Sequence, residues 1–218
     1  MTLASVLVTG GGSGIGAALA RELAARGCSV IVSGRRPHAL DAVASSSPLV
    51  STCPGDVTDP AHRAALVESL GSVPGPRAIV HAAGFFQVGR LSTLSLDDWR
   101  RSFEVNVEAR WTLSREAAGL LDDGRILFIG SDAGTSPRAG AAAYSIAQAA
   151  SETLRRALQA EWADTSISIA GFKPGLVDTE MVRGFMQLPL EDFPARVAYD
   201  EYVSNGQVAS PETIARFA

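Results

Sequence analysis

Two kinds of segment alternate along the chain up to about residue 172. Short β-branched runs, apolar on both faces, predict strands at 5–9, 29–33, 49–53, 78–81, 125–130 and 166–172. Longer runs rich in Ala and Leu predict helices near 14–26, 37–45, 60–70, 97–120 and 143–163. Buried strands separated by helices indicate an α/β fold, a Rossmann-like doubly wound parallel sheet in three layers.

The alternation is lost after the sixth predicted strand. Residues 176–209 mix Met, Phe, Pro and acidic residues, so we expect a lid-like insertion within a single domain over residues 1–218. The sequence then shows a capped helix start, with Ser210 as the cap, Pro211 at the first position and Glu212 in the first turn. No seventh strand is predicted, and we expect the open sheet edge to be covered by another chain or by sequence beyond residue 218.

Composition narrows the class of protein. A chain of 218 residues suits one domain, and its net charge of −4 gives no sign of a nucleic-acid or anionic-membrane surface. Cys28 and Cys53 lack metal-ligand spacing, and we expect free thiols in a reducing compartment and no metal site. We find neither a signal peptide nor an apolar stretch of membrane-spanning length, so we expect a soluble, cytoplasmic protein.

A glycine-rich turn, "TGGGSGIG" (9–16), follows the first predicted strand and opens a helix. Its glycines allow a tight turn and a close approach of the backbone to a ligand. The free N–H groups and the positive end of the helix dipole attract a pyrophosphate. This context favours a dinucleotide site over the alternative, a merely tight strand–helix turn.

The end of the second predicted strand indicates which dinucleotide binds. NAD-binding folds of this kind carry an acidic residue there for the ribose hydroxyls. In this chain Gly34, Arg35 and Arg36 occupy the place. A guanidinium group suits a ribose phosphate, so the sequence favours NADP(H), with solvated loop arginines as the alternative.

Further motifs agree in order and spacing with one known family. In chain order they are TGGGSGIG (9–16), GDVTD with Asp56, HAAG (81–84), Asn106, Ser131, Tyr144 and FKPG (172–175). Over nearly its whole length the chain therefore resembles the short-chain dehydrogenase/reductase family. HAAG stands where this family usually has NNAG, and Gln148 stands where it has a lysine one helical turn beyond the tyrosine.

The resemblance implies a catalytic set made of Asn106, Ser131, Tyr144 and Gln148. Ser131 would hydrogen-bond the substrate carbonyl and steady the developing oxyanion. Tyr144 would give or take the proton at that oxygen, and Asn106 would help to hold a proton-relay water. The expected cofactor-binding residues are Gly10, Ser13, Gly14, Ile15, Gly16, Arg35, Arg36, Asp56, Val57, Ala83, Gly84, Tyr144, Gln148, Pro174, Gly175, Val177 and Thr179.

Gln148 can hydrogen-bond a ribose but supplies no charge. A unit charge about 5 Å away, at an effective dielectric of about 20, is worth roughly 3 kcal/mol. Its loss should slow alcohol oxidation, which needs a phenolate base, more than carbonyl reduction, which uses the phenol. Lys173 is the only lysine, and it either replaces the missing cation or pairs with an acidic residue elsewhere.

The function that we expect is NADP(H)-dependent reduction of a small apolar or aromatic carbonyl compound, with Tyr144 as proton donor or acceptor. Aromatic and Met residues would line the substrate side, although lid packing explains them equally well: Phe85, Phe86, Met181, Phe185, Met186 and Phe193. The alternative is a catalytically impaired NADP(H)-binding sensor or partner subunit. By the resemblance, the helices at 97–120 and 143–163 would pair two copies in a homodimer, or in a tetramer.

Overall fold

A parallel sheet of six strands, in the order β3-β2-β1-β4-β5-β6, forms the centre of the computed structural model, which describes residues 4–217. The strands are β1 (Ser5–Thr9), β2 (Ser29–Gly34), β3 (Val50–Pro54), β4 (Arg77–His81), β5 (Arg125–Ile129) and β6 (Ser168–Phe172). The strand order reverses between β1 and β4, which creates a topological switch point at the carboxyl ends of these strands. The predicted Rossmann-like doubly wound sheet is therefore confirmed.

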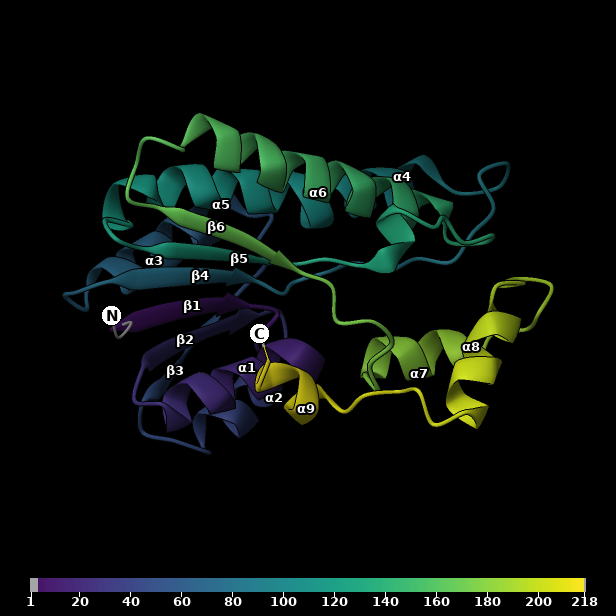
Figure 1. Ribbon diagram of the computed structural model, residues 1–218, viewed down its shortest axis with the longest axis horizontal. Helices are drawn as coiled ribbons and strands as arrows, with labels where there is room; N and C mark the ends of the chain where they lie inside the picture. Colours follow the sequence, from purple (N-terminus) through teal and green to yellow (C-terminus); the bar gives the residue numbers. More distant parts are fainter. Residues whose placement is uncertain (1–3, 218) are drawn as a thin grey trace.

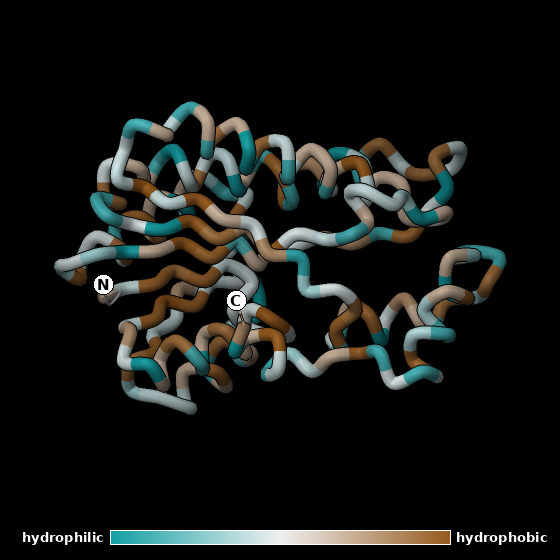
Figure 2. Tube along the Cα trace, viewed as in Figure 1, coloured by the Kyte–Doolittle hydropathy of each residue, from teal (hydrophilic) through white to brown (hydrophobic). Residues whose placement is uncertain are grey.

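Side chains alternate across the sheet and give it two apolar faces. Val6 and Val8 of β1 join one buried cluster, whereas Leu7 joins the other. The first face is covered by α1 (Gly14–Ala25), α2 (Pro37–Ala44) and α9 (Pro211–Ala215), and the second by α3 (Pro60–Gly71), α4 (Leu96–Phe103), α5 (Ala109–Ala117) and α6 (Ala142–Glu161) (Figure 1). The strands between these layers are the most continuously hydrophobic part of the chain (Figure 2).

Several helices begin where their sequences predict. The Asp59 carboxylate accepts a hydrogen bond from the N–H of Ala61 at the start of α3, and the Ser95 hydroxyl accepts one from Asp98 at the start of α4. Ser210 caps α9 in the same way through the N–H of Thr213, and Pro211 occupies the first turn. The short α9 packs its buried Ile214 and Ala215 back towards α1.

The predicted helix at 97–120 is an unbroken helical run from Leu96 to Leu120 whose winding changes along its length. A π-helical turn, Glu104–Glu108, separates α4 from α5, and a 3-10 turn follows at Ala118–Leu120. Asn106 lies in the π-helical turn, and its amide group exchanges two hydrogen bonds with the backbone of Phe85. The wider turn lets this side chain leave the helix surface for the neighbouring loop. Five of the six predicted strands differ from the observed ones by one or two residues at an end: β2 ends at Gly34, β3 is Val50–Pro54, β4 begins at Arg77, β5 ends at Ile129 and β6 begins at Ser168.

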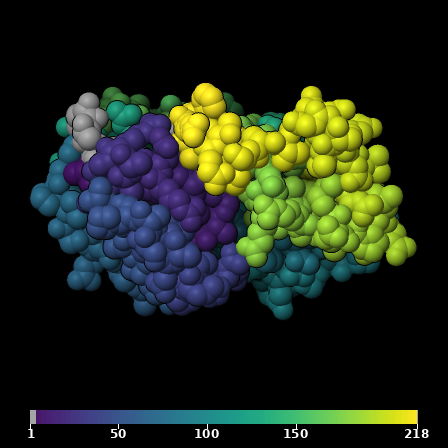
Figure 3. Space-filling model, turned by 90° about the horizontal axis from the view of Figure 1, so that it is seen from below, coloured from purple at the N-terminus to yellow at the C-terminus, as the bar shows by residue number. Residues whose placement is uncertain are grey.

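The 176–209 segment lies beyond the carboxyl ends of the strands (Figure 1). It contains α7 (Glu180–Met186) and α8 (Arg196–Ser204), and a bridge between Val177 and Ala209 brings its two ends together. Seen from below, it forms one end of the molecule, beside the N-terminal half (Figure 3). No helix within residues 4–217 has the length and apolar character needed to cross a membrane.

Candidate active site

A cavity of about 740 Å³ opens at the carboxyl ends of the strands, between the glycine turn and the 176–209 segment. This volume is in the range of sites that hold cofactors and small molecules. All of the predicted cofactor-binding residues line it, and so do Ser131, Tyr144 and Gln148. Asn106 is the one predicted site residue outside the lining. Residues 4–217 contain no cluster of side chains suited to a metal ion.

The glycine turn brings the backbone close to its neighbours. Gly10 has φ 68°, and a Cβ there would lie 2.7 Å from the Cα of Ala83. A Cβ on Gly16 would lie 2.4 Å from the carbonyl oxygen of Gly10, so neither position accepts a side chain. Ser13 precedes α1 but makes no side-chain capping bond. The first N–H groups of α1 are thus left for a ligand in the cavity, and the turn fits a pyrophosphate.

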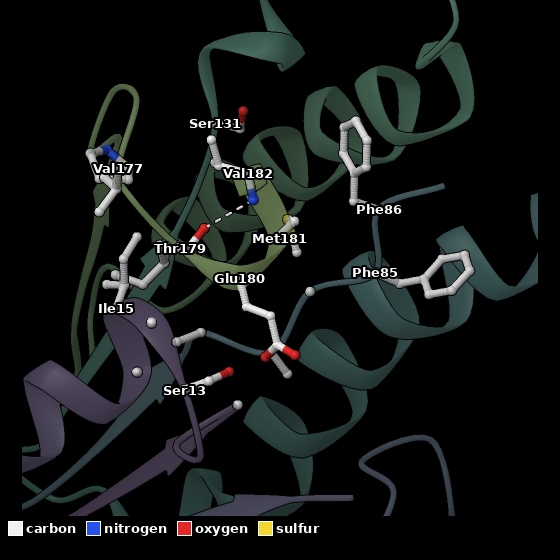
Figure 4. A pocket seen from close by; sticks show the side chains of 18 of the residues that line it. Ser13, Ile15, Phe85, Phe86, Ser131, Val177, Thr179, Glu180, Met181 and Val182 are labelled. Carbon is white, nitrogen blue, oxygen red and sulfur yellow. Dashed lines mark hydrogen bonds between the residues drawn. The ribbon is translucent and has the colours of Figure 1, made fainter. Parts of the chain in front are cut away.

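Arg36 lies at the rim beside this turn. Its guanidinium donates hydrogen bonds of 2.9 and 2.8 Å to the Glu180 carboxylate of α7 and one of 3.1 Å to the Ser13 hydroxyl. Figure 4 shows the Glu180 side chain extending from the 176–209 segment towards Ser13. The hydrogen bonds with Glu180 raise the pKa of Arg36 and lower that of Glu180. Sequence reasoning identified Arg36 but missed Glu180, which no local motif singles out.

The Asp56 carboxylate has protein partners of its own. Arg101 of α4 contacts it at 2.5 Å, and the Thr58 backbone N–H and hydroxyl donate to it at 3.0 and 2.8 Å. Although burial alone raises the pKa of Asp56, these hydrogen bonds outweigh it and lower the pKa. Asp56, Val57 and Arg101 all line the cavity, and Arg101 was not predicted from the sequence.

Tyr144 and Ser131 meet in the cavity from different elements. Tyr144 lies in the first turn of α6, and Ser131 follows β5, where its hydroxyl accepts a hydrogen bond from the N–H of Ala133 at 3.2 Å. Burial raises the pKa of Tyr144, and a hydrogen bond with Ser131 and the charge of Arg110 oppose that shift. The edge of the Phe86 ring packs against Tyr144 with centroids 4.9 Å apart. Tyr144 and Ser131 therefore line one cavity and interact with each other there.

Asn106 lies outside the cavity lining and holds part of the cavity wall in place. Its side chain is fully buried, with Nδ2 donating to the Phe85 carbonyl at 2.8 Å and Oδ1 accepting from the Phe85 N–H at 3.1 Å. These two bonds hold the 84–86 segment that lines the cavity.

Gln148 and Lys173 both line a smaller cavity, which Ser131 and Arg110 also border. Gln148 follows Tyr144 by one turn of α6, is 4% exposed, and its Oε1 has no hydrogen-bond partner among residues 4–217. Lys173 is exposed and lies with Glu152 at this cavity, whose volume is about 210 Å³. Its charge helps Arg155 to lower the pKa of Glu152, with the Arg155 hydrogen bond as the main cause. Lys173 forms no ion pair among residues 4–217, so both expectations for it stay predictions.

In the HAAG segment, where the family usually has two asparagines, the polar contacts at the strand ends come from His81 and Arg110. His81 is buried, its Nε2 lies 2.9 Å from the Ser114 hydroxyl, and burial holds its pKa well below the usual value. Arg110 of α5 joins the strand ends instead, donating at 3.0 Å to the carbonyl oxygens of Ala83 and Ile129. Sequence reasoning missed Arg110, which no motif singled out.

The expected substrate-side residues divide into two groups. Phe85, Phe86, Met181 and Phe185 line the cavity, together with Tyr199 of α8. Phe193 is fully buried and packs with Met186 in the cluster under α7 and α8, outside the cavity lining. Lid packing, the alternative explanation of these residues, therefore accounts for Phe193 and Met186.

The fold and the cavity together define a class of protein. A glycine turn at the head of α1, located at the switch point of a parallel sheet, is the arrangement that doubly wound α/β proteins use to bind a nucleotide. The profile of the family described as short chain dehydrogenase matches residues 4–187. The chain therefore belongs to the short-chain dehydrogenase/reductase family, whose members are NAD(P)-dependent oxidoreductases acting on small molecules.

Individual relatives agree with this assignment. The uncharacterized oxidoreductase YvrD of Bacillus subtilis (strain 168) is 30% identical over 188 residues, which cover 84% of this chain and 72% of YvrD. The crystal structure of the KRED1-Pglu enzyme has a TM-score of 0.91 at 27% identity and covers 98% of this chain and 92% of that one. A candidate NAD(P)-dependent gluconate 5-dehydrogenase from Beutenbergia cavernae, holding NADP at low occupancy, has a TM-score of 0.82 at 29% identity and covers 98% and 87%.

Proposed function

We propose that this protein is an NADP(H)-dependent oxidoreductase that reduces the carbonyl group of a small apolar or aromatic compound. The observation that carries the proposal is the meeting of the Tyr144 and Ser131 hydroxyls in the cavity that begins at the glycine turn. The aromatic lining by Phe86, Phe185 and Tyr199 supports an apolar substrate.

The cofactor would be held along one side of the cavity. The N–H groups at the start of α1 would bind its pyrophosphate, and Arg36 with Ser13 would bind the ribose phosphate. Preference for NADP(H) over NAD(H) is supported by the two guanidinium groups of Arg35 and Arg36 at the rim, where no carboxylate follows β2. When bound, the reduced nicotinamide supplies the hydride that reduces the substrate carbonyl.

The chain's own residues would manage the proton. Ser131 would donate a hydrogen bond to the carbonyl oxygen and so hold it beside Tyr144. The O–H bond of Tyr144 would then break, its proton would pass to that oxygen, and the phenolate would recover a proton from solvent. Gln148, one turn further along α6, would hydrogen-bond the ribose through its unpartnered Oε1. Asn106 would keep the Phe85 backbone in position.

The 176–209 segment would act as a lid within a single domain. Glu180 ties it to Arg36 at the rim, and Phe185 contacts Phe86 at 5.0 Å between centroids. We further expect a homodimer or higher homo-oligomer, because Trp111 of α5 and Ile146 of α6 leave 42% and 40% of their surfaces exposed.

Turnover of NADPH with a panel of apolar and aromatic ketones tests this function. The wild type should oxidise NADPH only when a ketone is present, and Tyr144→Phe should lower the rate at least about 100-fold. Trp162→Phe, an aromatic substitution at the opposite end of α6 and outside the cavity lining, is the control and should retain the wild-type rate. NADPH binding without turnover of any ketone would instead support the sensor or partner subunit.

A further inference from the structure

Arg110 is held rigidly at the point where three elements meet. Its guanidinium donates to the carbonyl oxygen of Ile129 at the end of β5 and to that of Ala83 beyond β4, both at 3.0 Å. A third bond of 3.1 Å goes to the Ser151 hydroxyl of α6. The residue is 4% exposed, so this position belongs to the interior of the protein.

The face of α6 that Arg110 contacts is the face that carries the proton-transfer residues. Tyr144, Gln148 and Ser151 follow one another at helical spacing and share this face. Arg110, Tyr144 and Gln148 also line the same cavity. Within residues 4–217, Arg110 Nε and Gln148 Oε1 are both buried without a hydrogen-bond partner, so the site contains an unused donor and an unused acceptor.

Arg110 carries a charge that no carboxylate neutralises. None of the ion pairs among residues 4–217 includes it. A buried cation is costly unless an anion faces it. Burial lowers the pKa of Arg110 and the interaction with Tyr144 opposes this shift. A guanidinium nevertheless stays protonated in proteins, also at alkaline pH.

We propose that Arg110 supplies, from α5, the positive charge beside Tyr144 that residue 148 does not carry. The inference rests on the proposed function, since it assigns a role in the same proton transfer. Arg110 is a positioning residue that acts through Tyr144 and does not exchange a proton itself. When the Tyr144 O–H bond breaks and the proton passes to the substrate oxygen, the new phenolate faces a guanidinium that is already fixed and desolvated.

Other charged and titratable groups face the same tyrosine. Tyr199 of α8 raises the pKa of Tyr144, whereas Arg110 and the hydrogen bond from Ser131 lower it. Arg138 lies over the Tyr199 ring at 5.7 Å, and both Arg138 and Asp132 act on Tyr199. Arg110 is thus the cation that acts on Tyr144 directly. Lys173 borders the smaller cavity together with Ser131 and Gln148.

Direct titration of Tyr144 tests the proposal without any substrate. Tyrosine labelled with carbon-13 at Cζ would be incorporated, and the Tyr144 signal assigned by its loss in Tyr144→Phe. In Arg110→Gln, which keeps a polar side chain but removes the charge, the phenolate fraction at a fixed alkaline pH should fall at least about tenfold. Arg110→Lys should stay within about threefold of the wild type. Arg115→Gln, the same change at an exposed position of α5, should have no effect.

The variants distinguish an electrostatic role of Arg110 from a purely structural role. If Arg110 only braces the strand ends, Arg110→Gln and Arg110→Lys will behave alike, and a native-like Arg110→Gln protein with an unchanged Tyr144 titration overturns the proposal. Gln148→Glu keeps Arg110 and so remains informative if Arg110→Gln does not fold. Its introduced carboxyl group, at a position that is 4% exposed, should be ionised at neutral pH because the guanidinium faces it, as its carbon-13 shift would show; a carboxyl group that stays protonated at neutral pH contradicts the proposal. Failure of ketone turnover would refute the proposed function and leave this titration unaffected.

Discussion

Arg36 gives the sharpest prediction about the cofactor. Arg36→Gln removes the guanidinium that donates to Glu180 and Ser13 at the cavity rim. In the proposed complex the same group binds the ribose phosphate of NADPH, a contact that NADH does not have. The substitution should therefore weaken NADPH binding and leave NADH binding nearly unchanged.

The magnitude follows from the two partners that compete for Arg36. Hydrogen bonds to a charged group contribute about 1.5–3 kcal/mol each. The existing pair with Glu180 is worth only about 0–1 kcal/mol, because the two side chains are 47% and 68% exposed and solvent screens them. The phosphate should thus displace Glu180 at little cost, and Arg36→Gln should weaken NADPH binding by about 10- to 100-fold.

Isothermal titration calorimetry with NADPH and NADH, at one fixed salt concentration, measures this difference. Arg183→Gln is the matched control, since it breaks another exposed ion pair of α7, with Asp178, and does not line the cavity. Glu180→Gln should tighten NADPH binding about two- to fivefold by freeing Arg36. Equal weakening of both cofactors by Arg36→Gln, or no weakening of either, would refute the assignment of Arg36 to the ribose phosphate.

Three further predictions concern acid–base behaviour and assembly. Because burial raises the pKa of Tyr144, alcohol oxidation, which needs the phenolate, should still increase with pH in the alkaline range where carbonyl reduction declines; a pH–rate profile in both directions checks the opposite slopes. His81 is buried and neutral with a depressed pKa, so protonation of the unfolded state should lower stability by up to about 1.4 kcal/mol per pH unit below pH 6.5. His81→Asn should reduce this acid sensitivity in denaturant titrations at pH 7 and 5.5, and an unchanged difference between the two pH values would argue against it. Trp111→Glu should convert the expected dimer to monomer in multi-angle light scattering, whereas a monomeric wild type would remove the expectation of a dimer.

Sequence patterns predicted the sheet well because each strand is short, apolar and bounded by a helix signal. The β1 bounds agree with the predicted 5–9, and the glycine turn lies where its motif indicates, at the head of α1. The π-helical turn at Glu104–Glu108 could not be predicted, because it depends on the bonds that Asn106 makes with Phe85, a residue 21 positions away.

The sequence predicted the motif residues of the candidate site, but not the charged residues that reach the site from other elements. Local spacing identified Ser131 and Tyr144, and the structure brings them into one cavity. Glu180, Arg101 and Arg110 reach that cavity from other elements, so only the tertiary fold shows that they face Arg36, Asp56 and Tyr144. The position of Lys173 next to the PG motif suggested the site, and its side chain lines the smaller cavity that Ser131 and Gln148 also border.

A crystal structure of the complex with NADPH would test the central claim most directly. The account predicts that the pyrophosphate contacts the N–H groups at the start of α1, with the nicotinamide ring beside the hydroxyls of Ser131 and Tyr144. A nicotinamide ring bound away from these hydroxyls, or a cofactor that does not touch the glycine turn, would contradict it.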